Sequence, residues 1–189
     1  LLTGHKGFIG SHLLIALESA GHSVDTYEWG DEKLPSVMDK DWVVHVGAIS
    51  STTERNVEKV MRQNVDFTIQ LYDECKTFGV GFQYSSSASV YGLVSTFGED
   101  APVDPITPYA WSKYFTERHI QRHMGGSPTQ IFRYFNVYGP EGEEHKGSQA
   151  SPFMQFKKQA KETGVIQLFE NSDKYQRDFI HVSKIVDMH

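Results

Sequence analysis

The sequence predicts an α/β protein with a doubly wound parallel sheet and the start of a smaller C-terminal substrate domain. Short apolar segments that fit strands alternate with longer segments whose apolar residues recur at helical spacing. A glycine-rich loop joins the first predicted strand to the first predicted helix. Strands that alternate with helices favour parallel pairing, with helices on both faces of the sheet.

The first strand and helix frame the glycine loop. The first strand is left only residues 1–3, LLT, which are shorter than the usual strand of about 5 residues. Apolar residues then recur at helical spacing: Leu13, Leu14, Leu17 and Ala20. Gly21 follows them, at the place where a glycine commonly ends a helix.

The middle of the chain predicts two further strands around a long helix. Residues 42–48, WVVHVGA, fit a buried parallel strand. Only thirteen residues separate Glu28 from Trp42, too few for an extra strand with its own helix. A helix is indicated by apolar residues about four apart: Val57, Met61, Val65, Ile69 and Tyr72. The strand VGFQYSS at residues 80–86 follows, and then a loop from Gly92 to Ile106.

The last third predicts two more helices and three strands. Thr107 and Pro108 form an N-cap and first-turn pair, which predicts a helix to about His123. The strand TQIFRYFNVYG spans residues 129–139, and residues 151–164 repeat the signals for a helix start and stop. Two final strands are predicted at residues 165–170, VIQLFE, and residues 178–182, DFIHV.

Composition limits the partners and the compartment. The chain has 189 residues, 39% hydrophobic, with a net charge of −6 and no basic stripe, so we expect no nucleic-acid partner. No run approaches the ~18 apolar residues of a membrane span, so we expect no membrane partner. The single cysteine, Cys75, excludes an intramolecular disulfide and favours a cytoplasmic location. Because the first strand is short and the last helix stops early, we expect the chain to be truncated.

The glycine loop predicts a dinucleotide site. Gly4, Gly7 and Gly10 form GHKGFIG between a strand and a helix, where the backbone can approach a pyrophosphate and the helix N-terminus can bind it. Glu28 follows at about the offset of the carboxylate that binds the adenosine ribose. This carboxylate favours NAD, although nearby cations leave NADP open, and a purely structural turn is the alternative. Further cofactor contacts are predicted at Phe8, Ile9, Gly47, Ala48 and Asn64.

Two tyrosines stand four residues before a lysine. Tyr109 and Lys113 share a helix face and follow YSSSASVYG, whose serines end a strand at the edge where α/β sheets bind ligands. Tyr72, before Lys76, has no such serine strand and falls in the apolar stripe of its helix, so we predict that it packs in the core. Asn64 is either a support for the site or a helix-surface residue.

The predicted task of Tyr109 is proton transfer, for which a phenol with a pKa of about 10 is too weak an acid near neutrality. An ammonium ~4 Å away at an effective dielectric constant of ~20 contributes roughly 4 kcal/mol, or nearly three pKa units. We therefore predict that Lys113 lowers the pKa of Tyr109. Among the three serines, Ser87 is predicted to hold the substrate oxygen, with strand-end hydrogen bonding as the alternative.

Five motifs in order, GHKGFIG, SSSASVYG, YAWSK, FRYFNVYGP and RDFIHV, resemble the extended short-chain dehydrogenase/reductase family over almost the whole chain. Within it, SSTTE at residues 50–54, FRYFNVYGP and EHKGSQAS are most similar to the ADP-glyceromanno-heptose 6-epimerases. The resemblance implies a dinucleotide-binding Rossmann domain over residues 1–139. It implies a partial substrate-binding region over residues 140–189, with the last strand returning to the Rossmann domain.

The resemblance also implies roles for individual residues. The catalytic residues would be Ser87, Tyr109, Lys113 and Lys146, of which Tyr109 and Lys113 also bind the cofactor. The substrate-binding residues would be Ser51, Ser87, Asn136, Lys146 and Arg177. A surface ion pair for Arg177 and a solvated loop lysine for Lys146 are the alternatives. No metal site is expected.

The implied activity is epimerisation of a nucleotide-linked sugar by transient oxidation with a tightly bound NAD(P), in a homo-oligomer. A 4,6-dehydratase is disfavoured because the acidic pair of that chemistry is replaced by Ala88 and Ser89. A UDP-hexose 4-epimerase, or another nucleotide-sugar oxidoreductase, is the alternative among enzymes. A non-catalytic dinucleotide-binding module is the alternative from another class.

Overall fold

The computed structural model describes residues 1–189, which form two compact units, Leu1–Tyr134 and Phe135–His189. Compactness describes how the chain packs and not what each part does. The division into a dinucleotide-binding domain over residues 1–139 and a substrate region over residues 140–189 therefore stays a prediction. Each unit is described by itself below.

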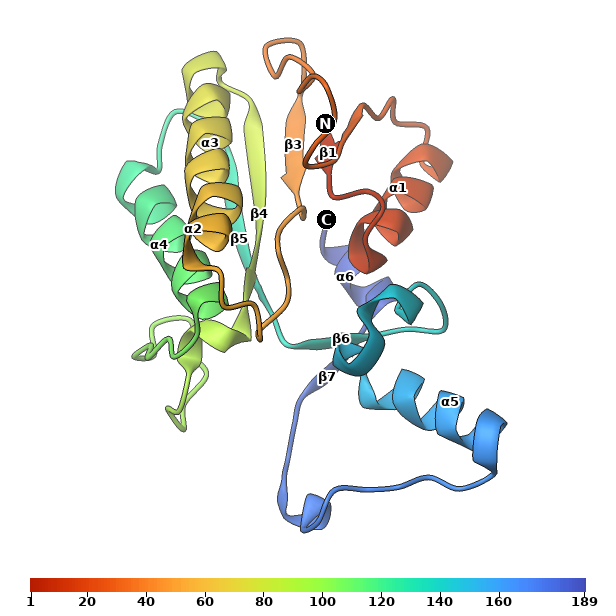
Figure 1. Ribbon diagram of the computed structural model, residues 1–189. Coiled ribbons are helices and arrows are strands. Elements are labelled where there is room, and N and C mark those ends of the chain that lie inside the picture. Colours follow the sequence, from red (N-terminus) through yellow and green to blue (C-terminus); the bar gives the residue numbers. More distant parts are fainter. The chain divides into compact units, whose positions relative to one another are not determined.

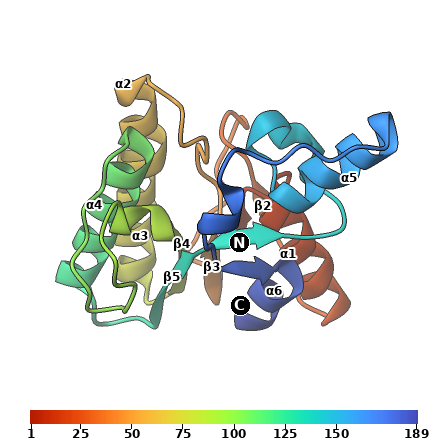
Figure 2. The same cartoon turned by 90° about the horizontal axis from the view of Figure 1, so that it is seen from below.

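The first unit contains the predicted parallel sheet. Its five strands are all parallel and lie in the order β2-β1-β3-β4-β5. In chain order they are β1 (Leu2–Thr3), β2 (Thr26–Tyr27), β3 (Trp42–His45), β4 (Gly81–Ser87) and β5 (Thr129–Tyr134). Helix α1 (Phe8–Ser19) lies on one face of this sheet, while α3 (Phe67–Phe78) and α4 (Pro108–His123) lie on the other (Figures 1 and 2). The doubly wound α/β fold is confirmed.

The strand order reverses between β1 and β3, and this determines where a ligand can bind. From β1 the chain moves to β2 on one side and then returns to β3 on the other side. Residues 28–41, between β2 and β3, form neither helix nor strand, as their small number predicts. In an open parallel sheet the carboxyl ends of the strands at such a reversal border a crevice.

The long predicted helix is continuous but changes its winding. It consists of α2 (Val57–Val60), the π-helical turn η1 (Met61–Asp66) and α3, and ends at Gly79, whose φ is +70°. Single π-helical turns inside α-helices occur frequently at functional sites. Asn64 lies inside this turn and is buried.

Helix α4 begins as its sequence predicts. The Thr107 side chain accepts a hydrogen bond from the Ala110 backbone N–H at 3.1 Å, and Pro108 occupies the first turn. A hydrophobic core of the first unit includes Leu71, Tyr72, Cys75, Phe82, Tyr84 and Ile120. Tyr72 is fully buried and its hydroxyl donates to the His123 carbonyl at 3.1 Å, so its predicted packing role is confirmed.

The second unit contains a two-stranded parallel sheet of β6 (Asn136–Tyr138) and β7 (Phe179–His181). Helices α5 (Pro152–Thr163) and α6 (Val182–Met188) belong to this unit, with the short helical turns η3 (Glu144–Gln149) and η4 (Ser172–Lys174). Ser151 caps α5, and Gly164 ends it with φ +71°, as predicted. None of the helices in either unit has the length and apolar content needed to cross a membrane.

Two strand predictions are wrong. Residues 129–139 do not form one strand, because the chain breaks at Phe135 into β5 and β6, which belong to different sheets. Residues 165–170 form no strand. Their apolar side chains are exposed, with Phe169 at 91%, and no strand of the structure pairs with them. An apolar pattern forms a strand only when a neighbouring strand takes up its backbone hydrogen bonds.

A buried histidine joins three elements of the first unit. His45, at the end of β3, contacts the Thr3 hydroxyl at 2.6 Å through Nδ1 and the Thr68 hydroxyl at 2.8 Å through Nε2. The Thr3 hydroxyl also accepts from the Gly47 backbone N–H at 3.2 Å. Burial, together with the charge of Lys113, lowers the pKa of His45 to about 3, so the imidazole is neutral at physiological pH.

This neutral imidazole predicts a loss of stability in mild acid. The unfolded chain protonates His45 below pH 6.5, whereas the folded chain does so only near pH 3. The contribution of His45 to stability is therefore fully present above pH 6.5 and is lost as the pH falls. From pH 7 to pH 5, His45 should lower the free energy of unfolding by about 2 kcal/mol. In urea unfolding, the free energy of unfolding of His45→Gln should fall by about 2 kcal/mol less between pH 7 and pH 5 than that of the unsubstituted protein. Exposed His22→Gln is the matched control, and equal slopes for His45→Gln and the unsubstituted protein would contradict this account.

Candidate functional site

The glycine loop brings three chain segments into close backbone contact. Gly4 has a φ of +76°, and a Cβ added there would lie 2.5 Å from the Gly47 Cα. A Cβ added at Gly10 would lie 2.0 Å from the Gly4 carbonyl oxygen. Gly7 precedes α1, whose N-terminus has no side-chain cap. Because these glycines carry no Cβ, the backbone of the loop and the helix end can approach an anionic group.

Glu28 lies at the end of β2, beside the glycine loop. Its Oε1 accepts a hydrogen bond from the Lys6 backbone N–H at 2.6 Å and lies 3.5 Å from the His5 Nδ1. Its backbone N–H donates to the Asp31 carboxylate at 2.7 Å. These contacts hold the carboxylate directly against the glycine loop.

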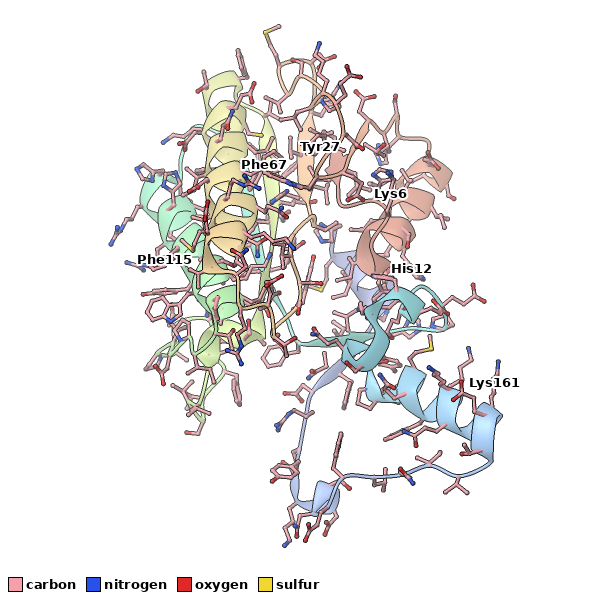
Figure 3. The ribbon with its side chains drawn as sticks, viewed as in Figure 1. Lys6, His12, Tyr27, Phe67, Phe115 and Lys161 are labelled. Atoms are coloured by element: carbon pink, nitrogen blue, oxygen red, sulfur yellow. The ribbon has the colours of Figure 1, made fainter.

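A pocket opens at the carboxyl ends of β1, β2 and β3, where the strand order reverses. Four of the predicted cofactor residues border it: Gly4, Glu28, Gly47 and Ala48. Aromatic rings form another wall: Tyr27 and Phe67, both labelled in Figure 3, stack at 5.5 Å. Trp29 meets Phe67 edge to face at 5.5 Å. The pocket therefore combines a carboxylate, exposed backbone and aromatic faces.

Asn64 connects this pocket to helix α4. Its Oδ1 accepts from the Ile49 backbone N–H at 2.8 Å, and its Nδ2 donates to the Ile49 carbonyl at 3.0 Å and to the Ser112 hydroxyl at 3.1 Å. All of these bonds are made within the protein. Of the two interpretations of Asn64, the structure favours support of the site over a surface position.

Ser87, Tyr109 and Lys113 lie together where β4 meets α4. The Lys113 ammonium is buried, donates to the Ser85 carbonyl at 2.7 Å, and lies over the rings of Tyr84 at 5.0 Å and Tyr109 at 5.8 Å. Tyr109 is buried, and the Ser87 side chain acts on its phenol by lowering the pKa that burial raises.

The other two serines of the strand face different partners. The Ser85 hydroxyl donates to the Tyr134 hydroxyl at 3.3 Å, and the Ser86 hydroxyl donates to the Glu117 carboxylate. Ser87 instead accepts from the Ser89 backbone N–H at 3.1 Å. Of the three serines, only Ser87 influences the pKa of Tyr109, and its role toward the substrate stays a prediction.

The predicted lowering of the Tyr109 pKa is wrong for this structure. Burial raises the pKa of the phenol, and hydrogen bonding to Ser87 opposes that rise. The reason lies in Lys113: burial lowers its own pKa to about 7, so it is only partly charged near neutrality, and its amine donates to the Ser85 carbonyl. Tyr109 is therefore a neutral phenol beside an amine that gains or loses a proton near pH 7.

Lys146 is held by a carboxylate within the second unit. Its ammonium lies 3.7 Å from the Glu143 Oε2, and burial lowers its pKa. Glu143 is fully buried and also accepts from the Ser151 backbone N–H at 2.7 Å and hydroxyl at 2.8 Å. These contacts argue against a purely solvated loop lysine.

The remaining predicted substrate residues are more exposed. The Asn136 side chain donates to the Asp178 carbonyl at 2.8 Å and so joins the start of β6 to the start of β7. Arg177 is exposed, and its guanidinium donates to the Gln176 carbonyl at 2.7 Å. Arg177 forms no ion pair with a carboxylate in this structure. Ser51, in the first unit, shares a 3.1 Å hydrogen bond with Thr53.

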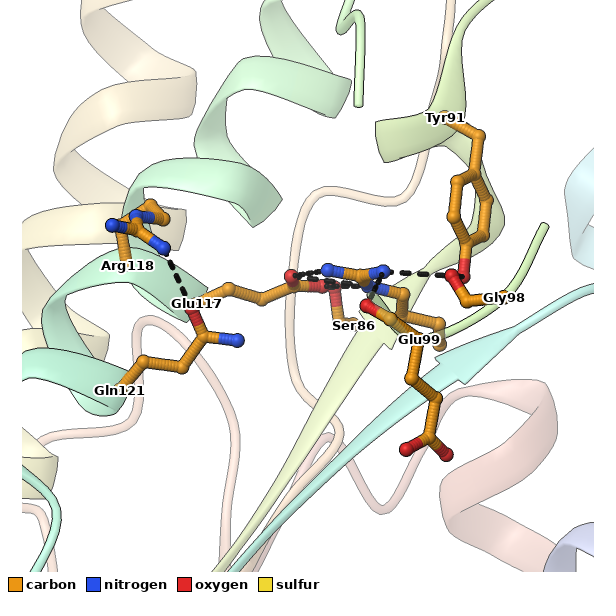
Figure 4. Close-up of polar contacts among 8 residues, drawn as sticks. Ser86, Tyr91, Gly98, Glu99, Glu117, Arg118 and Gln121 are labelled. Atoms are coloured by element: carbon orange, nitrogen blue, oxygen red, sulfur yellow. Dashed lines mark hydrogen bonds and ion pairs between the residues drawn. The ribbon is translucent and has the colours of Figure 1, made fainter. Parts of the chain in front are cut away.

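Glu117 and Arg133 were not predicted from the sequence. The Arg133 guanidinium binds both oxygens of the buried Glu117 carboxylate, with a shortest distance of 2.7 Å. Figure 4 shows Glu117 and its other partner, Ser86. Two signals were available: Glu117 lies four residues after Lys113 on the same helix face, and Arg133 interrupts an apolar strand.

The family model that matches the chain is that of the NAD dependent epimerase/dehydratase family, and the match covers residues 1–189. The chain belongs to this family. A relative of known assignment, the ADP-L-glycero-D-manno-heptose-6-epimerase of Alkalilimnicola ehrlichii, is 35% identical over 221 aligned residues. That alignment covers 98% of this chain and 69% of the relative.

Solved structures of the family share the fold. The ADP-L-glycero-D-manno-heptose-6-epimerase of Helicobacter pylori has a TM-score of 0.84 at 25% identity, covering 98% of this chain and 69% of that one. The UDP-glucuronic acid 4-epimerase of Bacillus cereus, solved with NAD, has a TM-score of 0.78 at 25% identity and the same coverage. The epimerase family expected from the sequence motifs is confirmed.

The crowding at the glycine loop gives a direct prediction for a family member. Gly10→Ala should weaken NAD binding at least tenfold, because the new Cβ displaces the Gly4 backbone; overpacking of this kind also lowers stability by roughly 1–3 kcal/mol. Gly98→Ala is the matched control, since a Cβ at Gly98 meets nothing within 4 Å. Titration calorimetry with NAD measures both variants. Equal affinity for Gly10→Ala and Gly98→Ala would show that the loop does not form the site.

Proposed function

We propose that this protein is a nucleotide-sugar epimerase that oxidises a carbinol carbon of its substrate and reduces it again from the opposite face. The observation that supports this most directly is the buried set of Ser87, Tyr109 and Lys113 at the carboxyl end of β4. Burying an ammonium beside a phenol is costly unless both groups are used or fully paired. A module that only bound a dinucleotide would need the glycine loop and not this set.

The residues of the first unit fit a bound NAD. Gly4, Gly7 and Gly10 leave no Cβ between the backbone and a pyrophosphate, and the α1 N-terminus presents N–H groups to it. Glu28 would accept from the adenosine ribose, and the pocket lined by Trp29 and Phe67 would take the adenine. The carboxylate of Glu28 would repel a 2′-phosphate, so NAD is the preferred cofactor over NADP.

Bound NAD supplies a hydride acceptor and donor and, when oxidised, a positive charge that favours a nearby phenolate. Tyr109 would take the hydroxyl proton of the substrate as its carbinol carbon is oxidised. Ser87 would hold the same substrate oxygen and, with Tyr109, polarise the ketone. Lys113, with a pKa of about 7, would stabilise the phenolate when it is charged.

Inversion of the centre requires an acid or base on the second face of the sugar. Lys146 is proposed for this role, since Glu143 holds its ammonium and burial lowers its pKa toward the working range. Arg177 is proposed to bind the diphosphate, because its planar fork matches phosphate oxygens. Asn136 and Ser51 are proposed to contact the substrate.

The proposed substrate is an ADP-linked glyceromanno-heptose inverted at carbon 6, supported by the two heptose epimerases among the similar proteins. A UDP-hexose 4-epimerase is the second candidate, supported by the similar fold of the UDP-glucuronic acid 4-epimerase. A cytoplasmic location and a homo-oligomeric assembly are part of the proposal. The single buried cysteine is consistent with a reducing compartment.

Loss of one hydroxyl tests the proposed chemistry. Tyr109→Phe should lower kcat for epimerisation by at least about 100-fold, because the proton acceptor is removed, and should leave NAD affinity within about threefold. The matched control is Tyr72→Phe, which removes the hydroxyl of the other tyrosine–lysine pair and should retain turnover. Product analysis by NMR on ADP-heptose and UDP-hexose measures both. Normal turnover by Tyr109→Phe would refute the mechanism.

Glu28 predicts the cofactor preference. The protein should bind NAD at least tenfold more tightly than NADP, and Glu28→Gln should reduce this ratio, because it removes the charge that repels a 2′-phosphate. Exposed Glu58→Gln is the control for a general change in charge. Equal binding of the two cofactors by the unsubstituted protein would contradict the assignment of Glu28.

A further inference from the structure

A buried carboxylate lies one helical turn beyond Lys113. Glu117 is 1% exposed and shares the face of α4 that presents Tyr109 and Lys113 to the sheet. Its carboxylate accepts from the Ser86 hydroxyl and from the Arg133 guanidinium, whose Nε lies 3.1 Å from both carboxylate oxygens. The carboxylate is therefore paired within the protein and is not placed to contact a ligand.

Lys113 and Glu117 fasten α4 to consecutive residues of β4. The Lys113 ammonium donates to the Ser85 carbonyl at 2.7 Å, and the Glu117 carboxylate accepts from the Ser86 hydroxyl. The next residue of the strand is Ser87, whose side chain lowers the pKa of the Tyr109 phenol. Three contacts, each one turn apart on the helix, thus match three successive residues of the strand.

Arg133 extends this fastening to the neighbouring strand and to the loop before α4. It lies opposite Ser86 in the register of β4 and β5. One of its NH groups donates to the Tyr91 hydroxyl at 3.1 Å and to the Glu99 carbonyl at 3.2 Å (Figure 4). A single guanidinium therefore joins β5, the loop of residues 92–106 and α4.

We propose that Glu117, held by Arg133, is a positioning residue for the proposed reaction: it fixes α4 on β4 so that Tyr109 faces Ser87, and it balances the charge of Lys113. This inference rests on the proposed function of Tyr109 and Lys113. Glu117 acts through those residues and not on the substrate.

The charges around Lys113 support this assignment. Burial lowers the pKa of Lys113 to about 7, and the Glu117 carboxylate is the group that opposes this by raising it. The other titratable groups around the ammonium are Tyr84 and Tyr109, over whose rings it lies, and His45, which is neutral. Removing the charge of Glu117 should therefore leave Lys113 neutral at a lower pH than before.

The test is Glu117→Gln in the whole protein, with lysine labelled by carbon-13 at Cε and the Lys113 signal identified by its loss in Lys113→Arg. The NMR titration midpoint of Lys113 should fall by about one pH unit. At pH 8, kcat for epimerisation should fall at least tenfold with KM changed less than threefold. The control is Arg118→Gln, which removes a charge from the exposed face of the same helix, where Arg118 binds Gln121 (Figure 4). It should change neither the Lys113 titration midpoint nor kcat.

A second variant covers the case in which the unpaired Arg133 prevents folding. Glu117→Gln combined with Arg133→Met removes both buried charges and should recover thermal stability, while the Lys113 midpoint and kcat stay low. If the Lys113 titration midpoint and kcat recover together with thermal stability in this double variant, Glu117 is merely structural and the inference is overturned. If the unsubstituted protein epimerises no nucleotide sugar, the proposed function fails, whereas the Lys113 titration still tests the contact with Glu117.

Discussion

The site depends on one buried ammonium. Lys113 can remain in the interior because the Ser85 carbonyl accepts a hydrogen bond from it, two aromatic rings face it, and Glu117 lies one turn away. These partners come from β4 and α4, so the helix has one position on the strand. That position brings Tyr109 to Ser87. The energetic need to satisfy a buried cation therefore determines the geometry of the proposed catalytic residues.

A second constraint, close backbone contact, forms the cofactor side of the site. Gly4, Gly10 and Gly47 leave too little room for a Cβ, so the glycine loop lies directly against the end of β3. Asn64 connects the two constraints, since its amide binds Ile49 after β3 and Ser112 on α4. The π-helical turn that contains Asn64 places this side chain between the pocket and the helix of Tyr109.

The sequence predicted features that local chemistry determines. Thr107 and Pro108 start α4, and the glycine pattern with Glu28 identifies the pocket. Features that depend on distant partners were missed. The segment at residues 165–170 has a strand pattern but no neighbour, and Arg133 meets Glu117 across a separation of sixteen residues. The shift in the Tyr109 pKa was predicted with the wrong sign, because a pairwise charge estimate omits the burial of both groups.

The most direct test of the proposed reaction follows the hydrogen on the carbon that is inverted. The substrate, deuterated at that carbon, is converted by the purified protein in ordinary water, and the product is examined by mass spectrometry and NMR. Temporary removal of a hydride in a closed site predicts that the product keeps its deuterium at the same carbon. Replacement of the deuterium by hydrogen from solvent would mean that the carbon is inverted by deprotonation, and would contradict the account.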